Sequence, residues 1–446
     1  MSSNVKVNRE LPVRHDVDVF VAGGGPAGVA AAVAAARQGA GVFLAEGHSC
    51  FGGMGTAGLV PAYMTFGDGE HFLAAGIGEE VLDRLHAAGG TGPAYDPKYK
   101  KRGGVDIRAE VLKRVYDEMV ASAGVSFAFH TALVAVESSG GKVSAAICAA
   151  KSGLFAVTAK VYVDGTGDGD LAAWAGAPFE KGDADGAMMP GTLCSLWADV
   201  DWDAVDEGGL GAGNRRIEQA FADGVFTHED RHLPGMWRVG TTVGGGNIGH
   251  TFGVDGTDER SVTKALLWGR KSMLEYERYY KQYLKGFEDM KLVATGSLLG
   301  VRETRRIMGD YVLCLKDFTS RASFDDEIGR YCYPVDIHVA RPDRAAYEKF
   351  LDEWQTFRYG PGESYGIPYR VLLPRGLDNV LVAGRCVSAD RHMQSSIRTM
   401  PGCYITAQAC GVAAAMAAAG GVGPREVDVS ELQQRLIRIG ACLPGK

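Results

Sequence analysis

Two apolar runs near the start of the chain flank a glycine-rich turn and a run of small residues. The first covers 17–22, interrupted only by Asp18, and the second covers 42–45 and ends in Glu46. Between them, alanines and valines continue without a helix breaker as far as Gln38. Short apolar runs of this kind are typical of strands buried on both faces. The pattern therefore predicts a strand–turn–helix–strand unit at the start of a parallel sheet.

The rest of the chain alternates between helical and period-two patterns. Helices are expected at 72–88, 107–122, 261–287 and 401–419. The last of these is a run of small residues with Pro401 in its first turn, where a missing N–H costs nothing. Three β-rich runs at 125–136, 143–149 and 154–163 are separated by Ser-Gly turns and predict an antiparallel meander. A last short strand is expected at 379–384.

The turn after the first strand carries the spacing Gly23-x-Gly25-x-x-Gly28, which is the dinucleotide-binding fingerprint in its strand–helix context. Gly23 permits the tight turn, Gly25 lets the backbone approach a pyrophosphate, and Gly28 lets the helix pack close to the strand. The free N–H groups and positive dipole end of the helix, at Pro26 and Ala27, are expected to hold the diphosphate.

Glu46 lies 18 residues past Gly28, where an acid can grip the ribose hydroxyls. A carboxylate there repels a 2′-phosphate, so NADP is disfavoured at this site. The glycine-rich segment that follows is expected to run along the diphosphate toward the reactive ring. Its predicted cofactor-binding residues are Gly47, Gly52, Gly53 and Met54.

The fingerprint alone does not separate FAD from NAD, but the meander favours FAD. A three-stranded meander before a returning glycine-rich strand occurs in two-dinucleotide-fold flavoproteins, and a plain NAD dehydrogenase has no use for it. The start of the last helix would then stabilise negative charge on the pyrimidine edge of the flavin. The other predicted cofactor-binding residues are Val134, Gly167, Asp168, Gly384, Arg385, Arg398, Pro401, Gly402 and Cys403. His48 or Cys50 is a candidate for a covalent flavin link.

The predicted fold class is α/β: a Rossmann-like FAD-binding domain with a parallel sheet and a β-meander, plus an inserted α+β substrate or capping domain. The predicted division gives the FAD-binding domain residues 1–184 and 371–446, and the capping domain 185–290 and 310–370. A return segment near the flavin is expected at 291–309.

Composition narrows the choice of function. Glycine supplies 62 of 446 residues, about twice the usual ~7%, which suits close backbone approaches to a bulky ligand. The net charge of −7 offers no support for nucleic-acid binding. No membrane span and no signal segment are evident. The nine cysteines are odd in number and form no C-x-x-C pair, so we expect reduced thiols, a cytoplasmic protein and no metal site.

Seven motifs give the chain a family resemblance over 18–420. They are GGGPAG at 23–28, FGGMGTAGLV at 51–60, VDGTGDGDLA at 163–172, GVRETRRIMGDY at 300–311, YPVDIH at 333–338, IPYRVLLP at 367–374, and NVLVAGRCVSA with SSIRTMPGCYITAQACG across 379–411. The chain resembles the bacterial FAD-dependent oxidoreductase family among the glutathione reductase-like flavoproteins. More distantly, it is similar to the flavoprotein subunits of succinate dehydrogenase and fumarate reductase. The resemblance implies bound FAD and redox chemistry but no particular substrate.

One position departs from the broader flavoprotein pattern. Those proteins usually place Asp after the closing glycine, to bind the ribityl hydroxyls, whereas this chain has Gly384-Arg385. The ribityl contact is therefore expected to be made differently.

Candidate catalytic residues follow from what flavin chemistry needs: a proton carrier and a cation for an anionic substrate. Arg302 and Arg306 could clamp such a substrate, with salt bridges to acids such as Glu303 as the alternative. The other candidates are His250 in a glycine-rich loop, Asp336 and His338 on one side of an expected strand, and His392 near the flavin edge. A structural role is the alternative for His250.

The sequence predicts an FAD-dependent dehydrogenase or reductase that moves a hydride between flavin N5 and a small polar or anionic substrate. The alternatives are a flavin monooxygenase, although AGRCVSADRH replaces the usual GDAAH-like stretch, and a non-enzymatic flavin-binding protein. A halogenase would carry W-x-W-x-I-P, which is absent. The electron partner stays open between oxygen, NAD(P)H and another carrier, and a homo-oligomer is possible.

Overall fold

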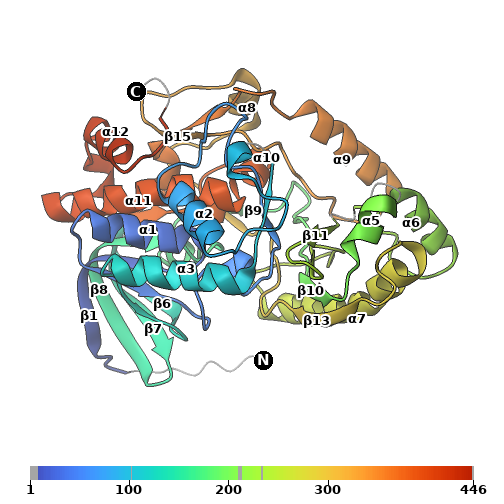
Figure 1. The fold of residues 1–446 in the computed structure, drawn as a ribbon. Helices are drawn as coiled ribbons and strands as arrows, with labels where there is room; N and C mark the ends of the chain where they lie inside the picture. Colours follow the sequence, from blue (N-terminus) through green and yellow to red (C-terminus); the bar gives the residue numbers. More distant parts are fainter. Residues whose placement is uncertain (1–8, 102, 209–212, 233–234, 444–446) are drawn as a thin grey trace.

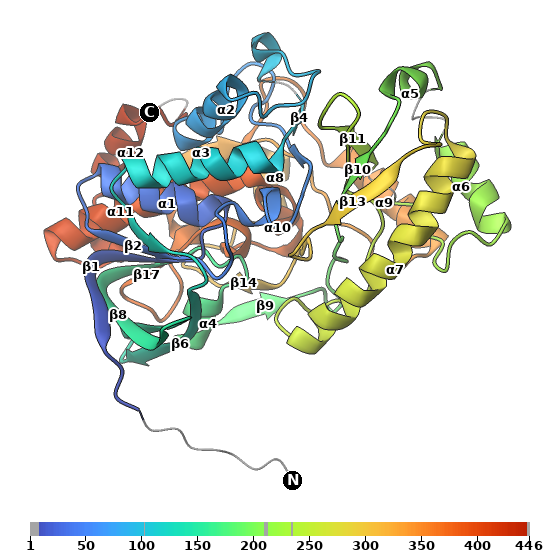
Figure 2. The same cartoon turned by 60° about the horizontal axis from the view of Figure 1, so that its bottom comes forward.

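The computed structural model describes residues 9–101, 103–208, 213–232 and 235–443. Figure 1 shows two regions side by side. One stacks several helices on a large sheet, and the other joins a smaller sheet to the long helix α7 (Glu259–Tyr283). Figure 2 shows the same arrangement turned by 60°.

The large sheet is built from the predicted first unit. Its parallel strands are β5 (Ser126–Ala128), β2 (Val42–Ala45), β1 (Val13–Ala22), β8 (Gly153–Asp164) and β17 (Val380–Val382), in that order. The last four residues of β1 (19–22) and all of β2 are buried, as expected of a sheet covered on both faces. The parallel sheet, both N-terminal strands and the late strand are thus confirmed.

The strand β8 belongs to two arrangements at once. It pairs in parallel with β1 over residues 156–164, and its end also pairs in parallel with β17. Its start pairs antiparallel with β7 (Lys142–Ala150), which pairs with β6 (Ala132–Ser139). The meander is therefore confirmed. The prediction of one continuous strand at 125–136 was wrong, because the chain takes a left-handed conformation at His130 (φ 50°). Residues before this turn join the parallel sheet as β5, and residues after it enter the meander as β6.

Two helices of small residues cover the same face of the sheet. The helices α1 (Pro26–Arg37) and α11 (Met400–Gly420) lie against each other (Figure 1). A Cβ added at Gly411 would lie 2.2 Å from the carbonyl oxygen of Ala31, so the helices approach closely only because this residue is glycine. The helix α11 is long and apolar enough to cross a membrane, but 89% of its most apolar window is buried inside the protein. It is a core helix here.

The smaller sheet has the order β11 (Met236–Arg238), β12 (Gly244–Gly246), β10 (Ser195–Ala198) and β13 (Lys291–Thr295). It lies near α5 (Trp202–Gly208), α6 (Gly213–Ala222), α7 and α9 (Arg344–Thr356) (Figure 1). Because β13 starts at Lys291, this sheet extends into the expected return segment. The proposed domain boundaries stay a prediction.

The other elements connect the two regions or flank them. The helices are α2 (Ile77–Ala87), α3 (Ala109–Ser122), α4 (Asp170–Trp174), α8 (Leu315–Ser320), α10 (Arg391–Ile397) and α12 (Val429–Arg438). The short strands are β3 (Ala62–Tyr63), β4 (Val105–Asp106), β9 (Phe179–Lys181), β14 (Arg305–Ile307), β15 (Glu327–Tyr331) and β16 (Tyr365–Pro368).

Candidate functional site

The three fingerprint glycines meet three different steric demands. Gly23 adopts φ 84°, and an added Cβ would lie 2.8 Å from the carbonyl oxygen of Gly165. A Cβ at Gly28 would lie only 1.7 Å from the carbonyl oxygen of Gly23. A Cβ at Gly25, in contrast, would meet no described atom within 4 Å. Gly23 and Gly28 therefore let the turn close, and Gly25 leaves open space at the start of α1 for a diphosphate.

The acid after β2 is held in place by backbone donors. Glu46 is only 5% exposed, and its carboxylate accepts from the N–H groups of Gly24 (2.6 Å) and His48 (2.7 Å). Gly47 faces Ala132 at the start of β6. Val134, also on β6, is 42% exposed. The predicted ribose-binding acid thus lies between the fingerprint turn and the meander.

The second glycine-rich segment folds over the first. Gly52 adopts φ 100°, and its N–H donates to the carbonyl oxygen of Gly24 at 2.8 Å. A Cβ at Gly53 would lie 3.2 Å from Cα of Gly25. Met54 follows in a single turn of 3₁₀-helix. The structure therefore brings these predicted residues to the open space beside Gly25.

The closing strand reaches the same place from the far end of the chain. Gly384 adopts φ 78°, and an added Cβ would lie 2.8 Å from Cβ of Ala27 and 3.4 Å from Sγ of Cys403. Pro401, Gly402 and Cys403 form the first turn of α11. The starts of α1 and α11 therefore meet at Gly384.

Arg385 occupies the position where related flavoproteins have Asp, and it forms an ion pair with a carboxylate from another segment of the chain. Its guanidinium donates to Oδ1 of Asp168 (2.7 Å), to the carbonyl oxygen of Gly167 (2.8 Å) and to that of Val301. Asp168 also accepts from Oγ1 of Thr304 at 2.7 Å. The expected second glycine motif and the closing strand are thus joined, with the Asp168 carboxylate beside the position where Asp would normally stand.

We expect Arg385→Gln to weaken cofactor binding by about tenfold or more, because a charged hydrogen-bonded pair of this kind contributes about 1.5–3 kcal/mol. Titration of the protein with FAD, followed by flavin fluorescence, measures the change. Arg84→Gln is the control, since Arg84 makes a partly exposed pair with Glu80 on α2. Equal affinities in both variants would contradict the assigned role of Arg385.

These contacts form one continuous cradle: an open glycine turn at a helix start, a buried acid, and a second helix start closing over them. A sequence model described as FAD dependent oxidoreductase matches residues 18–436. The chain belongs to the FAD-dependent oxidoreductase family. The cofactor of this flavoenzyme is FAD, and the residues of the cradle fit it.

The comparisons add little beyond the family. Among solved structures, p-nitrophenol 4-monooxygenase from Pseudomonas putida is 12% identical, with a TM-score of 0.48 over 95% of this chain and 84% of that one. A geranylgeranyl bacteriochlorophyll reductase-like protein from Thermoplasma acidophilum is 13% identical, with a TM-score of 0.45 over 95% and 82%. The search of curated proteins found no match. Similarities this low carry no argument about the substrate.

A buried polar cluster lies next to the expected flavin end of the cradle. The chain passes from Val301, which accepts from Arg385, directly to Arg302. Arg302 is buried and donates to the carbonyl oxygen of Pro190 (2.9 Å) and to Oγ1 of Thr192 (2.8 Å). Arg398, just before α11, contacts Asp336 at 3.0 Å. Two guanidinium groups are therefore held at the start of α11.

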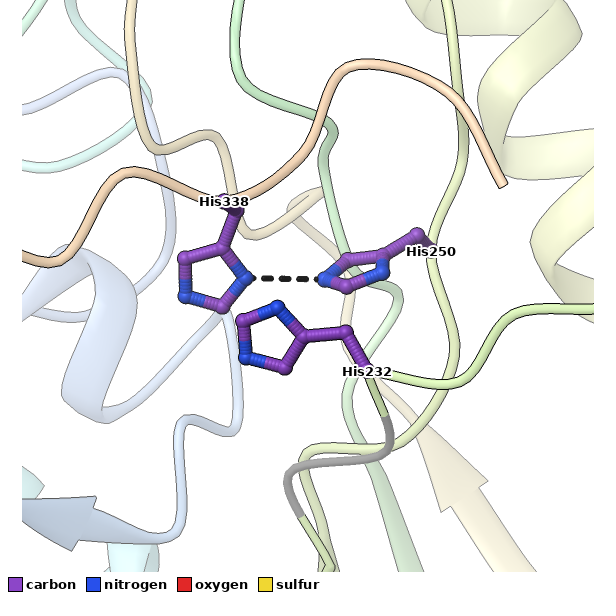
Figure 3. A group of neighbouring side chains, drawn as sticks. All are labelled: His232, His250 and His338. Carbon is purple, nitrogen blue, oxygen red and sulfur yellow. Dashed lines mark hydrogen bonds between the residues drawn. The ribbon is translucent and has the colours of Figure 1, made fainter. Parts of the chain in front are cut away.

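Histidines complete this cluster. Nε2 of His250 lies 2.9 Å from Nδ1 of His338, and Figure 3 shows the two rings edge to edge with His232 beside them. Nε2 of His338 lies 3.4 Å from Oδ2 of Asp336, and Nδ1 of His250 lies 2.9 Å from Oδ2 of Asp230. The segment around Asp336 is not the expected strand, since β15 ends at Tyr331. Asp336 and His338 nevertheless come together.

Burial and the two arginines set the protonation of this cluster. Burial, with the positive charges of Arg302 and Arg398 among its neighbours, holds the pKa of His338 well below its usual range. Burial raises the pKa of Asp336, and the two guanidinium groups oppose this rise. Burial and the nearby Arg398 lower the pKa of Arg302 to about 10. At neutral pH, the site therefore presents two cations and a neutral His338.

Two predicted catalytic residues are placed elsewhere. Arg306 donates to Glu303 (2.6 Å) and to the carbonyl oxygen of Gly182 (3.1 Å), which is the structural salt bridge considered as its alternative. His392 lies on α10, and among the described residues no hydrogen bond or ring contact joins its imidazole to the cluster. The structure does not bring either side chain into the cluster.

Asp230 and His232 were not among the predicted site residues. Both lie in the segment HEDRH at 228–232, where four of five side chains can bind a proton or a metal. Such a density of polar groups between apolar segments was the available signal. It was not used, because nothing in the spacing indicated that this segment lies against His250 and His338.

Proposed function

We propose that this flavoenzyme oxidises or reduces a small organic anion, by hydride transfer between a substrate carbon and flavin N5. The observation that carries the proposal is the pair of guanidinium groups near Asp336: Arg302 is buried, and the side chain of Arg398 is 12% exposed. A cation that is shielded from solvent binds a carboxylate far more strongly than a cation on the protein surface does. FAD, when bound, supplies the hydride acceptor or donor.

The chain's own residues would then bind and orient the substrate and move one proton. Arg302 is kept rigid by its bonds to Pro190 and Thr192, and Arg398 by its contact with Asp336. The contact between Asp336 and His338 supports a proton carrier beside the clamp. Burial of the cluster excludes water, which strengthens each of these interactions.

The test is anaerobic mixing of the FAD-loaded protein with a panel of small hydroxy, amino and unsaturated carboxylic acids. We expect at least one acid to bleach the flavin band near ~450 nm, or to reoxidise chemically reduced flavin. Matched amides or alcohols that lack the carboxylate serve as controls and should react much more slowly. Equal reaction of acids and neutral analogues would sink the anionic assignment. Reduction by NAD(P)H alone, followed by oxygen uptake with a neutral substrate, would favour a monooxygenase.

A further inference from the structure

Three histidine side chains from distant segments meet in the polar cluster. One ring nitrogen from each of His232, His250 and His338 lies within 4.8 Å of the other two, and Figure 3 shows the three rings grouped around a common gap. Only one hydrogen bond forms among them, between His250 and His338. Nδ1 of His232 is buried and has no hydrogen-bond partner among the described residues. Leaving a buried nitrogen without a partner is unfavourable, so this arrangement calls for a ligand.

The outer nitrogens of two of these rings face carboxylates. Asp230 lies 2.9 Å from Nδ1 of His250, and Asp336 lies 3.4 Å from Nε2 of His338. Metal-binding histidines commonly present their second nitrogen to a carboxylate, which fixes the ring and increases the basicity of the ligating nitrogen. Nδ1 of His250 and Oδ2 of Asp230 are close but form no hydrogen bond among the described residues, while Nε2 of His250 and Nδ1 of His338 lie 2.9 Å apart on the inner side of the cluster.

The charges around the gap permit a cation. A neutral imidazole keeps a free lone pair on one ring nitrogen, and this is the form that binds a metal ion. The two negative charges of Asp230 and Asp336 equal in number the two positive charges of their guanidinium neighbours, Arg302 and Arg398. Arg302 is further occupied by Pro190 and Thr192. An anionic substrate would add the negative charge that a bound cation needs.

We propose that His232, His250 and His338 bind one divalent first-row transition metal ion, of the Zn²⁺ or Fe²⁺ type. Neutral imidazoles suit these ions, and three protein ligands leave a position open for a substrate oxygen. The His232 ring stacks on His338 at a centroid distance of 4.1 Å. Binding requires it to turn out of this stack, because ligating rings must point at one metal. The proposal goes beyond the proposed function, and it leaves Asp336 available as a proton acceptor.

The experiment uses the full-length, FAD-loaded protein. It is treated with a chelator, dialysed against Zn²⁺ and analysed for zinc by mass spectrometry. We expect about one zinc per chain in the wild type. His232→Gln, His250→Gln and His338→Gln should each lower zinc affinity by on the order of 100-fold or more, and Asp230→Asn by roughly 10- to 100-fold. When cobalt replaces zinc, the wild type should show the visible absorption of cobalt held by few ligands. The three histidine variants should not show it.

The control is His228→Gln, because His228 lies four residues from His232 but is exposed and outside the cluster. Flavin content and circular dichroism show that each variant is folded. A wild type that retains no more zinc or iron than the variants would overturn the proposal, as would zinc binding that survives all three substitutions. Either result leaves the flavin reaction with small acids untouched, since that assay is read from the flavin band without added metal.

Discussion

Protein carrying Gly28→Ala is expected to lose its FAD and much of its stability. The new Cβ would lie 1.7 Å from the carbonyl oxygen of Gly23 and 2.8 Å from the carbonyl carbon, and no rotamer change can relieve a clash between backbone and Cβ. Overpacking usually costs about 1–3 kcal/mol, and a clash with backbone at this distance should cost at least ~3 kcal/mol. The helix α1 must move away from β1, which also dismantles the turn that holds the diphosphate.

The matched control is Gly25→Ala, three residues earlier in the same turn. Its Cβ would meet no described atom within 4 Å, so the thermal unfolding midpoint without added FAD should stay close to that of the wild type. It would, however, occupy the space through which the diphosphate approaches, and we expect FAD affinity to fall about tenfold or more. Thermal unfolding and FAD titration measure the two effects separately. A stable Gly28→Ala protein with normal flavin content would disprove the assigned packing.

The cofactor cradle could be predicted from sequence because its rules are local. Gly23, Gly25, Gly28 and Glu46 lie within one strand–helix–strand unit. The clash at Gly28 is with Gly23, and Glu46 accepts from its neighbours in the same stretch of chain; Gly23 alone meets a distant residue, Gly165. Even the closing contact at Gly384 was predictable, since a late strand ending in glycine must add to the same sheet. The partner of Arg385 could not be predicted from local pattern, because Asp168 is 217 residues away in the sequence.

The buried polar cluster could not be predicted from the sequence, because its residues also come from distant segments. His232, His250 and His338 come from loops whose meeting depends on how the segments around the smaller sheet pack, and loops carry no periodic signal. His250 and His338 were chosen for their neighbours, and His232 was overlooked. Arg306 resembled Arg302 in sequence, but only tertiary packing gives one a salt bridge with Glu303 and the other a place in the cluster. The break at His130 was likewise invisible, since both sides favour strands.

Replacing Arg398 should have the largest effect on the reaction while leaving the cofactor in place. In Arg398→Gln, Asp336 loses its cationic partner at 3.0 Å inside a buried site, and the substrate loses half of its proposed clamp. Removing one member of a buried charge pair costs about 2–5 kcal/mol, so flavin reduction by a reactive acid should slow by about 100-fold or more. The loss should be much smaller for any neutral analogue, because that molecule gains little from the cation.

Arg391→Gln provides the control, because Arg391 begins the helix α10 and Arg398 caps its other end. Arg391 pairs with Glu303 at 3.1 Å and with Asp183 at 3.5 Å, away from the histidines, so its loss should alter stability more than the rate of reduction. Stopped-flow reduction at several acid concentrations separates weaker binding from a slower hydride step, and flavin absorbance confirms that each variant retains FAD. If Arg398→Gln reduced its flavin as fast as Arg391→Gln at every concentration, the cation at Arg398 would have no part in holding the substrate. The clamp would then have to be sought at Arg302 alone, whose rigid position between Pro190 and Thr192 would still direct one charge into the site.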